Sequence, residues 1–387
     1  MNMGKYISRD LKILSIAFFF LFMGSSFQQF VRPYLQESTS WSEMQISAIL
    51  ITLYSVIMVW RIFIQYSVKL LGDYFSIVLA SLTYSGFVLV LYLTKQYPLV
   101  ILAALVWGWG GASLWIVSST QVLDAVSQSR YGRASGIFYG ATHAGFAIGV
   151  LLLGRMGQQY GKDAILLTAL TAMVIGNVAM LSVPRRRVNR ETGIRTLFSV
   201  MRSTKAKIVS FFLFASALGF GFLLGAFTGV ARAKEESFIY LANAAFLFPL
   251  ARFIVSLVGG SISDKLGRAK TLILPFFVCS AGLFLAGLWS NIFTIGISAF
   301  GLGLLGGLVP VAAMAIIGDS ANIERRHLAF GALFFWRDLG VVFSLSLGQY
   351  LLVRLGEFHQ CFIIFAFIFL VCALLSIVLI KREAEAF

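Results

Sequence analysis

Charged residues are scarce in this chain. They account for 12% of its 387 residues, against 59% hydrophobic residues, and the mean hydropathy is +0.88. A soluble domain with this balance would have too little polar surface to stay in solution. The three cysteines fall inside apolar stretches, where we expect buried thiols rather than disulfides or metal ligands. The three histidines are scattered, so the sequence indicates no enzyme, metal or cofactor.

Long apolar runs dominate what is present. A helix needs about 20 apolar residues to cross a bilayer, and runs of that length recur from Leu11 to Ile380. They predict an all-α integral membrane protein. Its twelve transmembrane helices are expected at approximately 11–33, 44–67, 75–94, 98–122, 134–157, 164–183, 207–231, 237–262, 271–289, 292–317, 328–353 and 360–380.

Basic residues outnumber acidic ones, with 31 Lys and Arg against 16 Asp and Glu. With the N-terminus placed inside, most of the basic residues fall in segments on the same side of the membrane, which is the positive-inside pattern. The excess charge therefore indicates topology and attraction to anionic lipid rather than nucleic acid. We expect both termini to be cytoplasmic, in a bacterial inner (plasma) membrane.

The longest polar interruption follows the sixth apolar run and divides the chain into two halves. It predicts an N-terminal six-helix domain over 1–183, a basic cytoplasmic linker over 184–206 and a C-terminal six-helix domain over 207–387. Sliding one half on the other by 195 residues aligns several glycines, together with Asp124 on Asp319 and Arg130 on Arg325. The halves are therefore expected to be pseudo-symmetric parallel repeats, related by an axis along the membrane normal.

One cytoplasmic motif points to a family. The stretch "GGSISDKLGRAK" (259–270) resembles the loop motif of the major facilitator superfamily. Its positions are filled by Gly260, Asp264, Lys265, Gly267, Arg268 and Lys270. The resemblance extends over the whole chain and implies two domains that rock around a central site, in a protein for which a monomer is sufficient. These residues are expected to control gating rather than to bind substrate.

The first half departs from this motif. Its corresponding stretch "QYSVKLLGDYFS" (65–76) keeps Gly72, but Lys69 stands where the family has Asp, and Asp73 stands where it has Arg. The charges are exchanged. Either a compensating reversal on a neighbouring helix preserves the ion pair, or the latch of this half is weaker.

Few ionisable residues lie deep inside the predicted spans: Arg61, His143, Arg252, Arg337 and Asp338. Counted along the helices from cytoplasmic charges, they lie about 12 to 18 Å deep in a hydrocarbon core about 30 Å thick. In the fold that the family resemblance implies, helices 2 and 11 meet at the domain seam, as do helices 5 and 8. Every buried charge is on one of these helices, so pairs of Arg61 with Asp338 and of His143 with Arg252 are plausible.

A charge inside a membrane needs a partner or water. Adjacent helical residues point about 100° apart, so Arg337 and Asp338 are not expected to neutralise each other fully. Three arginines against one carboxylate favour an anionic substrate. The candidate substrate-binding residues are Arg252, Arg337, Arg61, Gln28 and Trp115, and the candidate proton-coupling residues are Asp338 and His143. Arg61 with Asp338 is alternatively a structural salt bridge, and His143 is alternatively a simple hydrogen-bonding group.

The leading functional hypothesis is a secondary transporter that moves a small organic anion together with protons by alternating access. Efflux of drugs or lipids is the first alternative, although helix 5 lacks the Gly-Pro step of the family's antiporters at 145–146. A membrane receptor or scaffold on the same fold is the second, and it has only short loops with which to bind partners.

Overall fold

The computed structural model describes residues 8–185, 188–227, 238–266, 268–355 and 358–385, without the side chains of 259–272, 353, 358 and 380–385. The regular elements in these residues are all helical, so the predicted all-α class is confirmed. They are α1 (Arg9–Ser25), η2 (Ser26–Gln29), α2 (Val31–Ser38), α3 (Glu43–Leu93), α4 (Tyr97–Asp124), η3 (Gln128–Arg130), α5 (Tyr131–Tyr160), α6 (Lys162–Met180), α7 (Ile194–Ser199), η4 (Val200–Arg202), α8 (Thr204–Phe222), η5 (Leu223–Phe227), α10 (Phe238–Leu266), α11 (Arg268–Trp289), α12 (Ile292–Ser320), η6 (Ile323–Arg325), α13 (Arg326–Leu355) and α14 (Phe358–Glu385).

The number of crossings depends on how α3 and α11 are counted. Ten helices of the described chain are long and apolar enough to cross a membrane, and α3, with 51 residues, is one of them. Its backbone is non-helical at Gly72, where φ is 72°, so α3 consists of two helices joined at a residue that favours glycine. The apolar part of α11, Ile273–Trp289, is shorter than the other spans. Counting both, the arrangement is consistent with the twelve crossings that were predicted.

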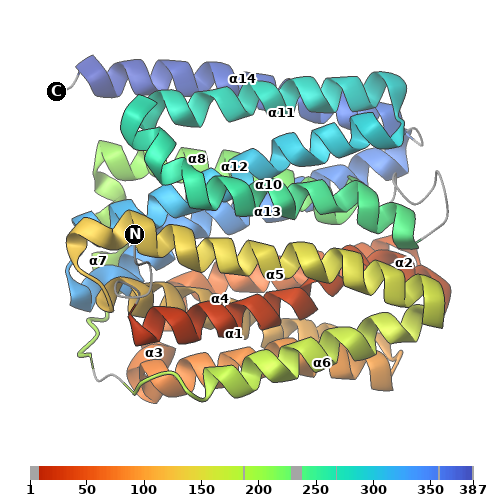
Figure 1. Cartoon of the computed structure of the whole chain (residues 1–387), viewed down its shortest axis with the longest axis horizontal. Coiled ribbons are helices and arrows are strands. Elements are labelled where there is room, and N and C mark those ends of the chain that lie inside the picture. Colours follow the sequence, from red (N-terminus) through yellow and green to blue (C-terminus); the bar gives the residue numbers. More distant parts are fainter. Residues whose placement is uncertain (1–7, 186–187, 228–237, 267, 356–357, 386–387) are drawn as a thin grey trace, which may run out of the picture.

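The two halves of the chain lie side by side along a common seam (Figure 1). Helices α1 to α6 occupy the lower part of that view, and most of α8 to α14 lies in the upper part. Across the seam α10 packs against α5, and α13 packs against α3. These are the helix pairs that were expected to carry the buried charges.

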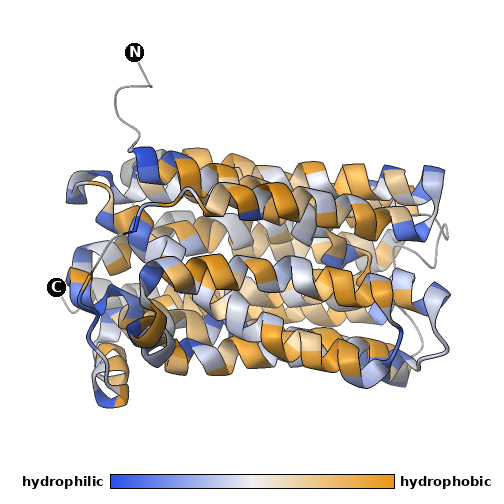
Figure 2. Cartoon of the chain, turned by 90° about the horizontal axis from the view of Figure 1, so that it is seen from below, coloured by the Kyte–Doolittle hydropathy of each residue, from blue (hydrophilic) through white to orange (hydrophobic). Residues whose placement is uncertain are grey.

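Apolar residues fill the middle of the bundle, and polar residues gather at its two ends (Figure 2). The beginning of α1, the end of α14 and the short helix α7 all lie at one end, on the left of Figure 1. We call this the linker end. It is the end that the distribution of Lys and Arg predicts to be cytoplasmic.

Glycine allows α1 and α5 to approach closely. A Cβ atom added at Gly145 of α5 would overlap the backbone carbonyl of Phe19 on α1. We expect Gly145→Ala to lower the free energy of unfolding by about 1–3 kcal/mol, because extra volume in a packed interface forces the helices apart. Unfolding of the purified protein measures this. Gly132→Ala on the same helix is the control, because a Cβ there meets nothing within 4 Å, and equal stabilities of the two variants would contradict the expectation.

Candidate functional site

A small cavity lies between the two halves. Its volume is about 40 Å³, so it has room for only a few water molecules. The lining is mostly aromatic and cationic. It consists of Phe22, Gln28, Leu53, Tyr54, Ile57, Arg61, Tyr84, Trp107, Trp115, Thr142, His143, Phe146, Phe220, Arg252 and Arg337.

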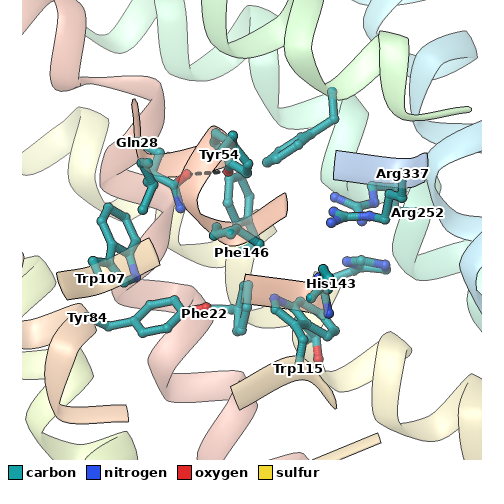
Figure 3. A pocket seen from close by; sticks show the side chains of 15 residues that line it. Phe22, Gln28, Tyr54, Tyr84, Trp107, Trp115, His143, Phe146, Arg252 and Arg337 are labelled. Atoms are coloured by element: carbon teal, nitrogen blue, oxygen red, sulfur yellow. Dashed lines mark hydrogen bonds between the residues drawn. The ribbon is translucent and has the colours of Figure 1, made fainter. Parts of the chain in front are cut away.

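Helical spacing explains why these residues meet. Tyr54, Ile57 and Arg61 lie three and four residues apart on α3, so they share one face. His143 and Phe146 are three apart on α5 and face the same space. Figure 3 shows the guanidinium groups from α10 and α13 entering this space opposite the aromatic side chains of the first half. The five predicted substrate-binding residues all line this cavity.

Asp338 is held between two arginines. Arg61 Nε donates to its Oδ2 at 2.7 Å, and Arg337 Nη1 donates to its Oδ1 at 2.8 Å. Asp338 is completely buried and Arg61 is 1% exposed. The plausible pair of Arg61 and Asp338 is therefore formed. Arg337 and Asp338 are hydrogen-bonded in spite of the angle between neighbouring positions, because the long Arg337 side chain reaches back to the carboxylate. Asp338 also shares its charge with Arg61, so the expectation that the two neighbours do not neutralise each other fully stays a prediction.

Among the described residues, Arg252 has no comparable partner. Its Nε donates to the backbone carbonyl of Gly306 at 3.1 Å, and no carboxylate of the described chain pairs with it. The guanidinium carbon lies 5.6 Å from the ring centre of Phe220 and 5.2 Å from that of Phe248, so both aromatic faces stabilise the charge. Gly307 of α12 lets the backbone of α12 pack closely against α10 at Arg252, since a Cβ at position 307 would lie 2.8 Å from the Cα of Arg252.

His143 lines the same cavity, but no hydrogen bond joins it to Arg252. Its Nε2 atom is buried and has no hydrogen-bond partner within the described structure. The ring lies 5.8 Å from that of Tyr139. The pair of His143 and Arg252 that depth made plausible is therefore not formed between these two described side chains, and His143 keeps a nitrogen available for a ligand.

Gln28 and Trp115, two further candidates for substrate binding, already contact neighbouring residues. The Gln28 Oε1 atom accepts from the Tyr54 hydroxyl at 2.7 Å, and its Nε2 donates to the carbonyl of Ser25 at 3.2 Å (Figure 3). The Trp115 ring stacks on that of Tyr139, with centres 5.5 Å apart. Both residues contribute to the cavity wall, with less freedom to bind a ligand than Arg252 has.

The gating motif is only partly within the described residues. Gly267 lies outside them, and only the backbone of Gly260, Asp264, Lys265, Arg268 and Lys270 lies within them. In the first half, Gly72 forms the break in α3, Lys69 is exposed, and Asp73 is 4% exposed.

Asp73 binds an arginine from the linker, which sequence reasoning did not single out. Arg190 Nη2 donates to Asp73 Oδ2 at 2.7 Å and to Asp124 Oδ2 at 3.0 Å. Its Nη1 donates to the carbonyl of Ile323 at 2.6 Å. Burial alone would lower the pKa of the Arg190 guanidinium, but its bonds to the two carboxylates outweigh this, so the pKa is raised above its ordinary value.

Sequence reasoning also missed part of the cavity wall. Phe22, Tyr84, Phe146 and Phe220 line the cavity but stand among many aromatics at helical spacing. Nothing in the sequence distinguishes them from packing residues. For Arg190 a weak signal existed, because the exchanged acidic residue at position 73 required a cation.

Comparisons with known proteins place this chain in a family. The Major Facilitator Superfamily profile matches residues 14–234 and 209–386, so the chain belongs to this family of membrane transporters rather than to an enzyme class. It is 25% identical over 287 residues to the probable nitrate transporter NarT of Staphylococcus haemolyticus (strain JCSC1435), covering 69% of this chain and 70% of that protein.

Solved structures share the fold. One comes from work on substrate recognition in proton dependent oligopeptide transporters, and it matches with a TM-score of 0.75 and 14% identity, over 98% of this chain and 99% of that one. Another is the human organic anion transporter MFSD10 (TETRAN), with a TM-score of 0.69 and 12% identity, over 95% and 99%. At these identities the likeness concerns the fold alone.

Proposed function

We propose that the protein moves a small anion across the membrane by alternating access, with protons as the coupling ion. Arg252 is the observation that carries this proposal. Its charge is buried beside the cavity, and within the described residues it donates only to a backbone carbonyl. A charge at this depth is costly unless it is paired. A carboxylate or an oxyanion would supply the partner in the planar, two-pronged geometry that suits guanidinium.

Charge and size in the cavity support a small anion. Three guanidinium groups line the cavity, and the one carboxylate among the described residues there, Asp338, binds two of them, so the local charge is positive even when Asp338 is ionised. The space holds only a few water molecules in this conformation. The similarity to a probable nitrate transporter agrees with a substrate of a few heavy atoms, whether a small carboxylate or an inorganic oxyanion.

Asp338 is the proposed proton carrier. When it binds a proton, Arg61 and Arg337 lose the negative charge that they share, and the cavity becomes more positive. An anion then binds more tightly. By linkage, the anion favours the proton to the same extent. This reciprocity predicts that the two are carried in the same direction.

Ligand-induced stabilisation of the purified protein tests the substrate class. A ligand that binds only the folded state raises the melting temperature by mass action. We expect nitrate or a small carboxylate to raise it, and phosphate tests whether a larger oxyanion is accepted. If only lipophilic cations or lipids stabilise the protein, efflux of drugs or lipids replaces the proposal. If no small molecule does, a receptor or scaffold role gains support.

The coupling role is tested with Asp338→Asn in proteoliposomes. We expect the variant to exchange anion across the membrane but to lose accumulation driven by a pH gradient, because Asn keeps the size of the side chain and one acceptor oxygen but has no titrating proton. The ratio of accumulation to exchange is the readout, so differences in protein amount cancel. Asp319→Asn, at an exposed site, is the control. Full accumulation by Asp338→Asn would exclude this residue as the carrier.

The remaining topology is part of the same proposal. The two six-helix domains 1–183 and 207–387 rock about the cavity, the linker 184–206 and both termini face the cytoplasm, and the membrane is a bacterial inner membrane. A single copy of the chain carries the whole cavity, so a monomer is sufficient.

A further inference from the structure

The first-half motif poses a specific electrostatic problem. Asp73 is 4% exposed in a position where the family resemblance implies a cation. Lys69, in the acidic position of that motif, is exposed and has no hydrogen bond to the described residues. A buried carboxylate without a partner is costly. The exchange of charges therefore requires a cation from another part of the chain.

We propose that Arg190 is the gating cation of the first half, and that the linker uses it to lock the linker end closed. Arg190 binds the carboxylates of Asp73 on α3 and Asp124 on α4, while it holds the carbonyl of Ile323 in the second half. Asp73 therefore takes its cation from the linker, while Asp124 also accepts a hydrogen bond from Arg326 Nη1 of α13 in the second half at 2.6 Å. The guanidinium side chain is 3% exposed, so solvent does not weaken these bonds.

Further contacts tie the linker to both halves. The backbone N–H of Glu191 donates to the carbonyl of Glu324 at 3.1 Å, and Arg325 Nε donates to Glu191 Oε2 at 2.8 Å. The N–H of Gly193 donates to Gln65 Oε1 of α3 at 2.6 Å. The segment that contains Arg190 therefore bridges the two halves at several neighbouring positions.

An apolar contact extends the lock toward the cavity. Leu197 of α7 is 1% exposed and packs against Leu328 and Ala332 of α13. A Cβ added at Gly331 would lie 3.4 Å from Leu197 Cδ1 and would also overlap the backbone carbonyl of Arg61. The linker thus covers the part of α13 that leads to Arg337 and Asp338.

The contacts also predict which side of the lock separates. Arg190 makes charge-assisted bonds to two carboxylates of the first half and one bond to a neutral carbonyl of the second. The attraction between full opposite charges at a buried site makes the bonds to the two carboxylates stronger than the bond to an uncharged carbonyl. When the linker end opens, Arg190 therefore stays with the first half. The bond to Ile323 and the contact of Leu197 with α13 break.

A cysteine placed beneath the linker measures the lock. The reporter is Ala332→Cys, at a position where the native alanine is 4% exposed. The three native cysteines are buried. We expect slow labelling of this reporter by a membrane-impermeant maleimide in inside-out vesicles. Adding Arg190→Gln is expected to accelerate labelling about tenfold, the change that corresponds to loss of one charge-assisted hydrogen bond. Arg195→Gln, an exposed arginine of the same linker, is the matched control.

Two further variants separate the lock from general loosening. Asp73→Asn is expected to accelerate labelling as well. The double variant is expected to be no faster than Arg190→Gln alone, because without Arg190 the side chain at position 73 has no bond to it left to lose. Ala373→Cys, buried in α14, reports on the rest of the fold and is expected to stay unlabelled. Equal rates for Arg190→Gln and Arg195→Gln, or acceleration at both reporters, would overturn the proposal. This test needs no substrate, so its outcome is independent of the anion hypothesis.

Discussion

Arg252→Ala is expected to reduce anion transport by at least about 30-fold, because truncating one partner of a buried charge pair costs about 2–5 kcal/mol. The same change is expected to remove the rise in melting temperature that the anion produces. Initial uptake into proteoliposomes and thermal unfolding measure the two effects. The physical reason is that no described carboxylate competes for this guanidinium, so its loss falls on the ligand.

Two further variants show whether the loss of transport comes from the charge of Arg252 or from its forked geometry. Arg252→Lys keeps the charge but loses the forked donor, so we expect an intermediate rate. Arg155→Ala removes an exposed arginine of α5 and is expected to transport normally. Wild-type transport by Arg252→Ala would remove this residue from the substrate site and would leave it as a structural cation that packs against two aromatic rings.

Asp338→Ala is expected to lower the free energy of unfolding by about 3–5 kcal/mol, the usual effect of removing one member of a buried ion pair. The variant leaves Arg61 and Arg337 buried without the carboxylate to which both donate. Adding Arg61→Leu is expected to recover part of the loss, because it removes one of the two uncompensated charges. Unfolding in detergent, followed by a probe of tertiary structure, measures each variant.

The control for this prediction is Asp319→Ala, which removes an exposed carboxylate near the end of α12. Exposed charges contribute little to stability, so a change below about 1 kcal/mol is expected. If Asp338→Ala is as stable as Asp319→Ala, the carboxylate between the arginines does not hold the two halves together.

Much of the fold could be predicted from the sequence. A run of about 20 apolar residues forms a membrane-spanning helix. The family resemblance implied which helices meet at the seam, and the buried charges all fall on those helices, α3, α5, α10 and α13. The cavity contains the predicted side chains for the same reason, since membrane burial leaves so few ionisable groups that each one is conspicuous.

Side-chain geometry was less accessible. The interpretation of Arg337 and Asp338 used the angle between adjacent positions on a helix, whereas a long arginine side chain can return to its neighbour. Arg190 was hidden because it lies in a loop with several other arginines, and only the folded chain brings it to Asp73. Contacts between segments far apart in sequence depend on packing that local patterns do not encode.

The contact of Arg252 with two stacked phenylalanine rings has a consequence for how tightly a ligand binds. A free arginine side chain has about 2 kcal/mol of rotamer entropy. Here the rings of Phe220 and Phe248 and the Gly306 carbonyl restrict the side chain before any ligand arrives. Its entropy is lost when the protein folds, so an arriving anion does not have to order it. Replacing either ring by alanine would restore that freedom and weaken binding without removing a single atom of the guanidinium group.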